Sequence, residues 1–273
     1  MSFGGWLLAL VGVFAALTAL YWFAIGGFFR PRTPEWLTSQ PYAHRGLHFD
    51  TVHPENSLAA FRSAANAGFG IELDVHKTAD GHVVVIHDDT LARMTGDPRP
   101  VSAVTLSELR KLHLGESTET IPTLGEALEA VQGRVPVLVE IKARNGAGAL
   151  ESEVVQEIGA YHGPIALMSF DPLSLRRIRQ LAFEVPRGQI TGLFKDAGRP
   201  AWETFVLRRF LLDFLSRPDF VVDEIAASPS WDARAQHATG RKVLVYAPTT
   251  PAEAERALQN ADGVIAEPGA LGR

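Results

Sequence analysis

Short apolar runs alternate with segments of helical spacing from residue 41 onward, and this alternation constrains the fold most strongly. Alternating strands and helices over about 240 residues argue for a parallel fold, and that length is ordinary for a barrel. We therefore predict an α/β fold of the (β/α)8 TIM-barrel type. Strands are expected near residues 41–46, 71–76, 136–142, 165–170, 185–191, 220–225, 243–246 and 263–266. Helices are expected near residues 58–68, 123–131, 149–161, 172–181, 205–215, 231–238 and 251–259.

The stretch 70–88, GIELDVHKTADGHVVVIHD, indicates a strand, a turn and a second strand. In its first strand Glu72 and Asp74 alternate with apolar residues, which is the period of two that strands show. Residues 78–81 have the composition of a turn. At about 3.3 Å per residue, the Cα atoms of Glu72 and Asp74 lie roughly 6.6 Å apart on one face. Both carboxylates can then reach one hard divalent cation, and the hairpin brings His87 back towards them.

Two departures from a regular barrel are expected. Residues 89–120 follow the hairpin without a clear period, apart from a helix expected near 106–112. We interpret this segment as a small insertion after the second strand, beside the active face. After Pro268 the sequence contains five more residues, GALGR, so we expect the eighth helix to be missing or very short.

Residues 6–29 form a run of 24 residues without a charge. As a helix it would be about 36 Å long, enough to cross a hydrocarbon core of ~30 Å with some tilt. The alternative is a cleaved signal peptide, but no Lys or Arg precedes the run and no A-x-A cleavage site follows it. We expect a retained transmembrane anchor over residues 1–30, a polar linker over 31–40 and the barrel over 41–273, with the insertion at about 89–120.

The charge balance limits the possible partners and the location of the domain. The chain has 26 basic and 31 acidic residues, a net charge of −5, which argues against a nucleic-acid-binding protein. Cysteine is absent, which excludes disulfides, zinc thiolates and thiol chemistry but is compatible with either side of a membrane. Arg30 and Arg32 lie just after the apolar run, so the positive-inside rule favours a cytoplasmic catalytic domain on a single-pass membrane protein.

Three carboxylates lie at the ends of otherwise apolar strands, namely Glu72, Asp74 and Glu140. The carboxyl ends of barrel strands converge on one face, where active sites are found. Ionised groups at such positions are costly without a partner. Ion pairs with Arg or Lys are one solution, and a shared divalent cation is the solution that we expect. Ligation by oxygen alone suits Mg²⁺ or Ca²⁺ better than zinc.

Two histidines and two cations lie at the same expected face. Imidazole titrates near neutral pH, so one of His44 and His87 can accept a proton from a nucleophile while the other donates one to a leaving oxygen. Arg45 and Lys142 are candidates for binding phosphate oxygens, and salt bridges to the carboxylates are compatible with that role. Glu55 is either a rim residue or a side chain that points into the site.

The remaining polar candidates have structural explanations. Asn56 is a plausible N-cap of the helix that follows it, and Gly68 a plausible end of that helix. Three histidines are expected at the rim of the site, namely His48, His53 and His76. Four are expected to have structural roles, namely His82, His113, His162 and His237.

Seven motifs follow one another from residue 43 to residue 268. They are AHRG (43–46), PENSLAAF (54–61), IELDVHKTADGHVVVIHDDTLARMT (71–95), IPTLGEAL (121–128), LVEIK (138–142), SF (169–170) and ADGVIAEP (261–268). In these motifs the chain resembles the glycerophosphodiester phosphodiesterase family, which belongs to the PLC-like phosphodiesterase superfamily of TIM barrels. The resemblance implies a (β/α)8 barrel with a small insertion after the second strand.

The resemblance also implies an activity, which is hydrolysis of glycerophosphodiesters to glycerol 3-phosphate and an alcohol with one divalent cation, Mg²⁺ or Ca²⁺. The chain departs from the family at Tyr246-Ala247-Pro248, where relatives usually have a tryptophan and a small polar pair. That wall normally borders the leaving group, so the substrate preference stays open. The implied roles are acid–base catalysis for His44 and His87, metal ligation for Glu72, Asp74 and Glu140, and contact with substrate or phosphate for Arg45, Lys142 and Glu55.

Two other functions are compatible with the sequence. A membrane-anchored lysophospholipase D would use the same catalytic residues on lysophospholipids, with the helix expected at 205–215 against the bilayer. A membrane-tethered binding module without activity is the third hypothesis, and the intact set of polar residues speaks against it. The expected substrate is therefore a small-molecule or lysolipid phosphodiester, attacked either by water or by the neighbouring glycerol hydroxyl. The sequence does not indicate an oligomeric state.

Overall fold

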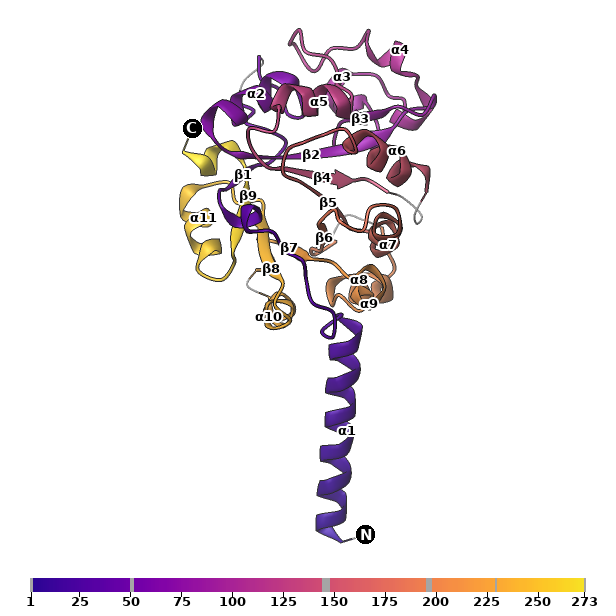
Figure 1. Ribbon diagram of the computed structural model, residues 1–273, viewed down its shortest axis with the longest axis vertical. Helices are drawn as coiled ribbons and strands as arrows, with labels where there is room; N and C mark the ends of the chain where they lie inside the picture. Colours follow the sequence, from indigo (N-terminus) through magenta and orange to yellow (C-terminus); the bar gives the residue numbers. More distant parts are fainter. Residues whose placement is uncertain (1, 50–51, 144–147, 195–197, 229, 273) are drawn as a thin grey trace.

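Eight parallel strands close into a barrel in the computed structural model, which describes residues 2–49, 52–143, 148–194, 198–228 and 230–272 (Figure 1). The first strand pairs with both the second and the last, which closes the sheet and confirms the predicted (β/α)8 fold. A ninth strand, β3 (Val83–Val85), pairs antiparallel with β2 as the predicted hairpin. The barrel strands are β1 (Tyr42–Ala43), β2 (Gly70–Lys77), β4 (Val137–Ile141), β5 (Ile165–Ser169), β6 (Arg187–Ile190), β7 (Phe220–Glu224), β8 (Lys242–Tyr246) and β9 (Gly263–Ala266).

Helices surround the strands in the view of Figure 1. Several of them bury an apolar stripe, as in α5, where Leu124, Ala127, Leu128 and Val131 are buried. They are α2 (Leu58–Ala67), α5 (Leu124–Val131), α6 (Ala149–Ile158), α7 (Pro172–Leu181), α8 (Ala201–Arg208), α9 (Asp213–Ser216), α10 (Trp231–Ala238) and α11 (Pro251–Leu258). The last strand is followed by η3 (Pro268–Leu271), a single 3₁₀ turn, so the eighth helix is as short as expected.

The segment between β3 and α5 forms a small layer of its own. It contains α3 (Ala92–Thr95), η2 (Val101–Ala103) and α4 (Leu106–Leu109), and it lies at the top of Figure 1. Its apolar side chains pack together as a cluster separate from the main core, consisting of Val84, Ile86, Leu91, Val101, Val104, Leu109, Leu114 and Ile121. The insertion is therefore held to the barrel by burial of its own apolar surface.

The prediction of a single helix over residues 205–215 is wrong. The chain forms α8, then turns, and forms the short α9. The turn passes through Phe210, which has a left-handed backbone with φ of 56° and is buried against Ile25 and Val221. The apolar residues of this segment have the spacing of a helix. The helix is interrupted at Phe210, whose ring is buried against the N-terminal segment.

The N-terminal helix α1 (Phe3–Ala24) projects away from the side of the barrel where α8, α9 and α10 lie (Figure 1). The helix has 22 residues. An 18-residue stretch of it has a mean hydropathy of 2.2, and no residue of that stretch is buried by the protein. The helix ends before the apolar run does. Beyond Ala24 the chain turns onto the barrel, and Ile25 is completely buried against Val221 and Val243.

Arg241 holds the end of α1 to the barrel. Its buried guanidinium donates to the carbonyl oxygens of Ile25 and Gly26, both at 3.1 Å, and to the Pro218 carbonyl at 2.8 Å. It also donates to the Gln236 side chain at 3.0 Å. The last carbonyls of a helix have no intrahelical partner, so a buried helix end needs donors of this kind.

The segment that was expected to be a polar linker is packed against the barrel. The backbone N–H of Arg32 donates to the Asp219 carboxylate at 2.9 Å, and the Thr33 hydroxyl donates to the Asp219 carbonyl at 2.6 Å. The following turn, η1 (Glu35–Thr38), buries Leu37 completely in the core inside the barrel. Residues 25–40 are thus continuous with the barrel in packing and hydrogen bonding.

We predict that Arg241→Met lowers the free energy of unfolding by about 3 kcal/mol, because the carbonyl groups of Ile25 and Pro218 lose the guanidinium that donates to them. For a domain of this size the midpoint of thermal unfolding in detergent should fall by roughly 6–12 °C. Arg234→Met, an exposed position on α10, is the matched control and should change the midpoint little. Equal midpoints for the two variants would contradict the role of Arg241.

Candidate active site

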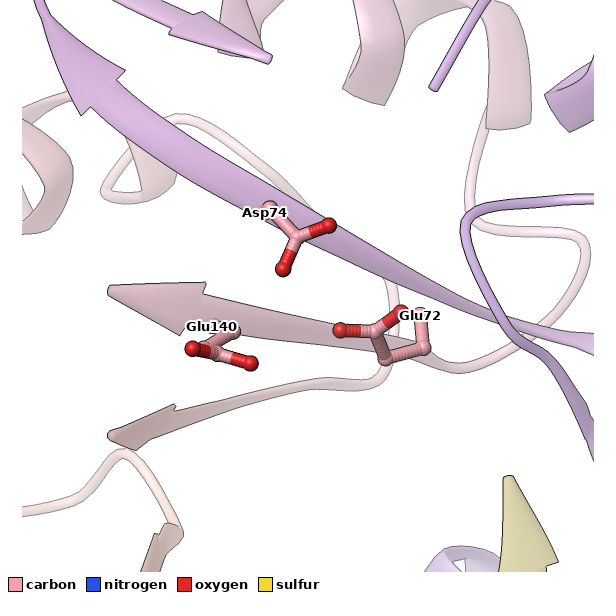
Figure 2. Close-up of side chains that lie close together, drawn as sticks. All are labelled: Glu72, Asp74 and Glu140. Atoms are coloured by element: carbon pink, nitrogen blue, oxygen red, sulfur yellow. The ribbon is translucent and has the colours of Figure 1, made fainter. Parts of the chain in front are cut away.

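Three carboxylates meet at the carboxyl end of two neighbouring strands (Figure 2). Glu72 and Asp74 come from β2 and Glu140 from β4, and the parallel register places Asp74 directly opposite Glu140. One oxygen from each side chain lies within 4.8 Å of the others. All three residues are buried. The sheet hydrogen bonds therefore impose the proximity of three groups that repel one another when ionised.

The local electrostatics show that this cluster needs positive charge. Burial and the neighbouring Asp74 raise the pKa of Glu72 to about 8, and burial also raises the pKa of Glu140. Burial opposes ionisation of Asp74 too, but the Lys142 ammonium holds the pKa of Asp74 below its usual range. Lys142 Nζ lies 2.9 Å from Asp74 Oδ1 and 2.6 Å from Glu140 Oε1. One lysine is thus shared between two of the three carboxylates.

The donor set fits a hard divalent cation. It consists of carboxylate oxygens only, which Mg²⁺ and Ca²⁺ prefer and which zinc rarely accepts without nitrogen or sulfur ligands. The three oxygens are already close enough to converge on one ion with small side-chain adjustments. The two positive charges of such a cation would also relieve the repulsion from Asp74 that helps to raise the pKa of Glu72.

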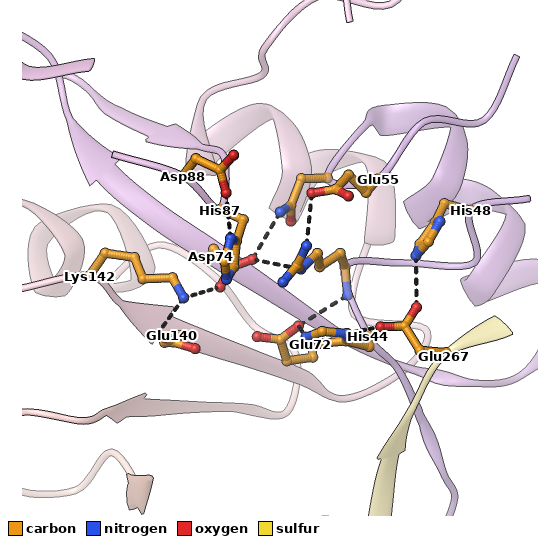
Figure 3. A network of polar contacts seen from close by, with 12 residues as sticks. His44, His48, Glu55, Glu72, Asp74, His87, Asp88, Glu140, Lys142 and Glu267 are labelled. Atoms are coloured by element: carbon orange, nitrogen blue, oxygen red, sulfur yellow. Dashed lines mark hydrogen bonds and ion pairs between the residues drawn. The ribbon is translucent and has the colours of Figure 1, made fainter. Parts of the chain in front are cut away.

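Two histidines border the carboxylates, and each is held by a carboxylate of its own (Figure 3). His44 Nδ1 lies 2.6 Å from Glu267 Oε1, and His87 Nδ1 lies 2.7 Å from Asp88 Oδ1. A carboxylate can only accept, so in each ring Nδ1 carries the hydrogen and Nε2 remains for chemistry. His44 Nε2 faces the triad, 3.9 Å from Glu72 Oε2.

The environments of the two rings move their pKa values in opposite directions. Burial disfavours charge on His44, but the hydrogen bond to Glu267 and the nearby Glu72 raise the pKa of this ring. Burial and the Lys142 ammonium lower the pKa of His87. Pairs of groups whose pKa values are pushed apart are typical of acid–base catalysis.

Arg45 lies between the triad and the insertion in a strained backbone conformation. Its φ is 56°, which non-glycine residues rarely adopt, and its N–H donates to Glu72 Oε2 at 3.0 Å. The guanidinium donates to Glu55 Oε1 at 3.0 Å, while its buried Nε–H has no hydrogen-bond partner among the described residues. Glu55 also accepts from Arg93, so this carboxylate orients two guanidinium groups and does not line the cavity.

The sequence analysis did not single out Glu267, Asp88, Asn56 or Arg93 for this network. Ser57, and not Asn56 as expected, is the N-cap of α2, and its hydroxyl accepts from the Ala60 N–H. The Asn56 amide is therefore available to donate to Asp74 Oδ2 at 2.9 Å. A signal existed for Glu267, because it directly follows β9, as His44 follows β1. Gly68 ends α2 as expected.

A cavity of about 650 Å³ contains both the polar cluster and a large apolar wall. Six of the eight predicted site residues border it, namely His44, Arg45, Glu72, His87, Glu140 and Lys142. The opposite wall is apolar or aromatic and includes Met168, Phe170, Ile190, Leu193, Phe194, Val222, Ile225, Tyr246 and Ile265. The site therefore combines a place for a charged group with room for an apolar one.

Other histidines surround this centre at its rim or lie on the outer surface. His48 Nε2 lies 3.4 Å from Glu267 Oε2, and His76 Nε2 lies 3.2 Å from the His87 carbonyl oxygen. His82 and His237 pair with surface aspartates, Asp80 and Asp262 respectively. The structure thus brings together the eight site residues that the sequence predicted. His82 and His237 lie outside the cavity lining.

A parallel barrel whose strand ends carry a carboxylate triad, two carboxylate-held histidines and an arginine defines the class of (β/α)8 phosphoric diester hydrolases. The sequence profile of the glycerophosphoryl diester phosphodiesterase family matches residues 44–267. This match covers most of the chain, and the chain belongs to that family. The family is hydrolytic and metal-dependent, which agrees with the acidic triad.

Known proteins and structures support the assignment. A glycerophosphodiester phosphodiesterase of Caldanaerobacter subterraneus subsp. tengcongensis is 38% identical over 152 residues, covering 51% of this chain and 61% of the relative. The chain therefore spans less than two thirds of that relative. Human glycerophosphodiester phosphodiesterase 1 is 30% identical over 245 residues, which cover 75% of this chain and 71% of the human protein.

Solved structures show the same fold. A phosphodiesterase of Oleispira antarctica, in complex with the product sn-glycerol-3-phosphate, superposes with a TM-score of 0.71 at 24% identity, covering 85% of this chain and 95% of that one. A glycerophosphodiester phosphodiesterase of Thermotoga maritima gives 0.65 at 27% identity, covering 85% of this chain and 96% of that one.

We predict that Glu267→Gln lowers the pKa of His44, because the variant removes the carboxylate that stabilises the charged ring. Since folding raises this pKa, the interaction stabilises fully below a pH of about 6.5 and is lost as the pH rises through the folded-state pKa. The variant should therefore lose stability at acidic pH and approach wild type at alkaline pH. NMR titration of the histidine rings measures the pKa, with exposed His237 as the internal control. An unchanged His44 titration would refute the interaction.

Proposed function

We propose that this protein hydrolyses glycerophosphodiesters to glycerol 3-phosphate and an alcohol, with the aid of one divalent cation. The observation that carries the proposal is the placement of two histidines, each fixed by a carboxylate, beside the Glu72, Asp74 and Glu140 triad in one cavity. Membership of the family and the names of its relatives support the same substrate class.

Glu72, Asp74 and Glu140 would hold the cation. When bound, a divalent cation supplies positive charge that withdraws electrons from a phosphate and stabilises its transition state. Arg45 would add a donor for a phosphate oxygen, because its buried Nε–H lies 3.7 Å from Asp74 Oδ2 and makes no hydrogen bond within the described residues. With the carboxylates neutralised by the ion, the Lys142 ammonium would also be available to phosphate.

His87 is assigned the general base and His44 the general acid. The lowered pKa of His87 keeps its Nε2 unprotonated, so it can accept the proton of the attacking hydroxyl. That hydroxyl belongs to water or to the substrate's own glycerol, and in the second case water must then open the cyclic phosphate to give glycerol 3-phosphate. The raised pKa of His44 keeps a proton for the leaving alcohol oxygen as the P–O bond breaks. Asp88 and Glu267 maintain the required tautomers, and Glu55 positions Arg45.

We further propose that α1 is a retained single-pass membrane anchor. By length and composition the helix can cross a membrane, a property that signal sequences share. Retention is favoured by the packing of its last turn, where Trp22 contacts Gly27 and Ile25 is buried in the barrel. Under the positive-inside rule, Arg30 and Arg32 beyond the span favour a barrel on the cytoplasmic side.

Lysophospholipids are a second candidate substrate class. The apolar wall of the cavity favours them, since Phe170, Phe194 and Tyr246 pack edge to face and present rings to the space beside the triad. A glycerophosphodiester with a small polar alcohol does not need such a wall, whereas an acyl chain does. A membrane anchor would also bring the site near such lipids.

The test is a hydrolysis assay with the full chain in lipid nanodiscs. Glycerophosphocholine and lysophosphatidylcholine are supplied separately with Mg²⁺, with Ca²⁺ or with EDTA, and released choline is measured. Hydrolysis of the first substrate that EDTA abolishes supports the proposal. Hydrolysis of lysophosphatidylcholine alone would favour the second candidate, and binding without release of choline would refute both.

We predict that His44→Ala and His87→Ala each lower turnover by about 10²-fold or more, because each removes a proton-transfer group. His162→Ala, at an exposed position, is the matched control and should retain wild-type turnover. Circular dichroism checks that the variants remain folded. Wild-type rates in either active-site variant would exclude the assigned roles.

We predict that Glu72→Gln raises the concentration of Mg²⁺ or Ca²⁺ needed for half-maximal activity, because one charged ligand is lost. Glu255→Gln, which removes an exposed carboxylate from α11 that belongs neither to the triad nor to the lining of the cavity, should leave the metal dependence unchanged. The measurement is activity as a function of free metal concentration. Identical curves for Glu72→Gln and wild type would argue against this triad as the metal site.

A further inference from the structure

Large aromatic side chains are exposed on the side of the barrel from which α1 leaves. Trp202, Phe205 and Trp231 are 69%, 56% and 54% exposed. Trp202 and Phe205 are three residues apart on α8 and therefore share one helix face. Single exposed aromatic residues need no explanation, but a contiguous group is typical of an interaction surface.

Arg209 joins the aromatic residues of α8 to those of α10. Its guanidinium carbon lies 5.7 Å from the Phe205 ring centroid and 4.6 Å from that of Trp231. The Trp231 ring in turn lies 5.5 Å from the ring of Tyr21 in the last turns of α1. The group Trp202, Phe205, Arg209 and Trp231, here called the α8–α10 face, is therefore continuous with the apolar helix.

The length of α1 fixes the level of this face relative to a bilayer. At 1.5 Å per residue, Tyr21 lies roughly 27 Å along the axis from Phe3. A hydrocarbon core is about 30 Å thick, and Tyr and Trp side chains collect where it meets the headgroups. With α1 across the membrane, Tyr21 lies at that level, and Trp231 beside it lies there too.

The charge on this face suits the headgroup region. The Arg209 guanidinium donates to Asp232 Oδ2 at 2.6 Å, so its charge is paired within the protein. A paired guanidinium between two rings costs less to bring against lipid than an isolated cation. The ring of Phe23 also packs at a tilt against that of Phe214 on α9, with 5.3 Å between the ring centroids, which extends the aromatic surface around the end of α1.

We propose that the α8–α10 face rests on the headgroup layer of the same bilayer that α1 crosses, so that the catalytic groove opens at the lipid surface. A groove of about 1040 Å³ runs from His87 and Lys142 to Trp202 on α8. This inference rests on the proposed membrane anchoring and adds a second membrane contact. Amphiphilic phosphodiesters in the membrane surface would then reach the triad without leaving the lipid.

The test uses the full chain, which has no cysteine, in nanodiscs of phosphatidylcholine. A cysteine introduced by Phe205→Cys is labelled with the fluorophore NBD, and Trp202→Cys provides a second position on the same face. Ser107→Cys, exposed on α4 at the opposite end of the molecule in Figure 1, is the matched control. Emission is compared between ordinary lipids and lipids brominated near the headgroup.

Quenching by brominated lipid at least two-fold greater at positions 205 and 202 than at 107 is expected. Equal quenching at all three positions would overturn the proposal. A blue-shifted emission at 205 and 202 that bromine does not quench would also overturn it, because a second copy of the chain would then cover the face. Choline release from soluble glycerophosphocholine is measured with the unlabelled wild-type chain in the same nanodiscs. Its absence despite quenching refutes the proposed hydrolysis and not the membrane contact.

Discussion

Mutual repulsion of three buried carboxylates is the constraint around which the mouth of this barrel is arranged. The parallel register of β2 and β4 sets Asp74 opposite Glu140, and the period of two adds Glu72 on the same face. Sheet hydrogen bonding thus forces together groups that burial makes costly to ionise. The surrounding residues respond to that cost, since Lys142 bridges two of the carboxylates and the backbone of Arg45 bends into a left-handed conformation to donate to Glu72.

The residues that surround the triad also balance opposite charges. Each histidine beside the triad lies near both acidic and basic groups, and the balance between burial and these charges sets the charge state that is favoured. Glu267 favours the charged form of His44, whereas Lys142 and burial favour the neutral form of His87. Arg93 ties this layer together from the insertion, because it donates to both Glu55 and Asp88. The insertion therefore contributes to the order of the site through Arg93.

The barrel and the inner cluster of the site could be predicted from the sequence. The strands and helices show local periodic patterns, and the site residues lie in or next to the apolar runs that form strands. Glu72 and Asp74 are two residues apart, and Glu140 ends a run of apolar residues. Contacts that depend on sites distant in the chain could not be inferred in this way. The buried ring of Phe210 breaks a helix that its own period predicts, and the capture of the α1 terminus by Arg241 joins residues with no common motif. Ser57 and Asn56 are both good caps, and only the position of Asp74 decides between them.

The clamp on the end of α1 also has a consequence for biosynthesis. Arg241 and Ile25 are separated by 216 residues, so ribosomes have made most of the chain before this contact can form. The amino-terminal helix emerges first and would enter the lipid while the strands that receive its end do not yet exist. Contacts of such long range are made late because closing a long loop costs entropy. With α1 as the proposed anchor, completion of the barrel would be coupled to a segment already in the membrane, and the last contacts of the fold would form at the bilayer surface.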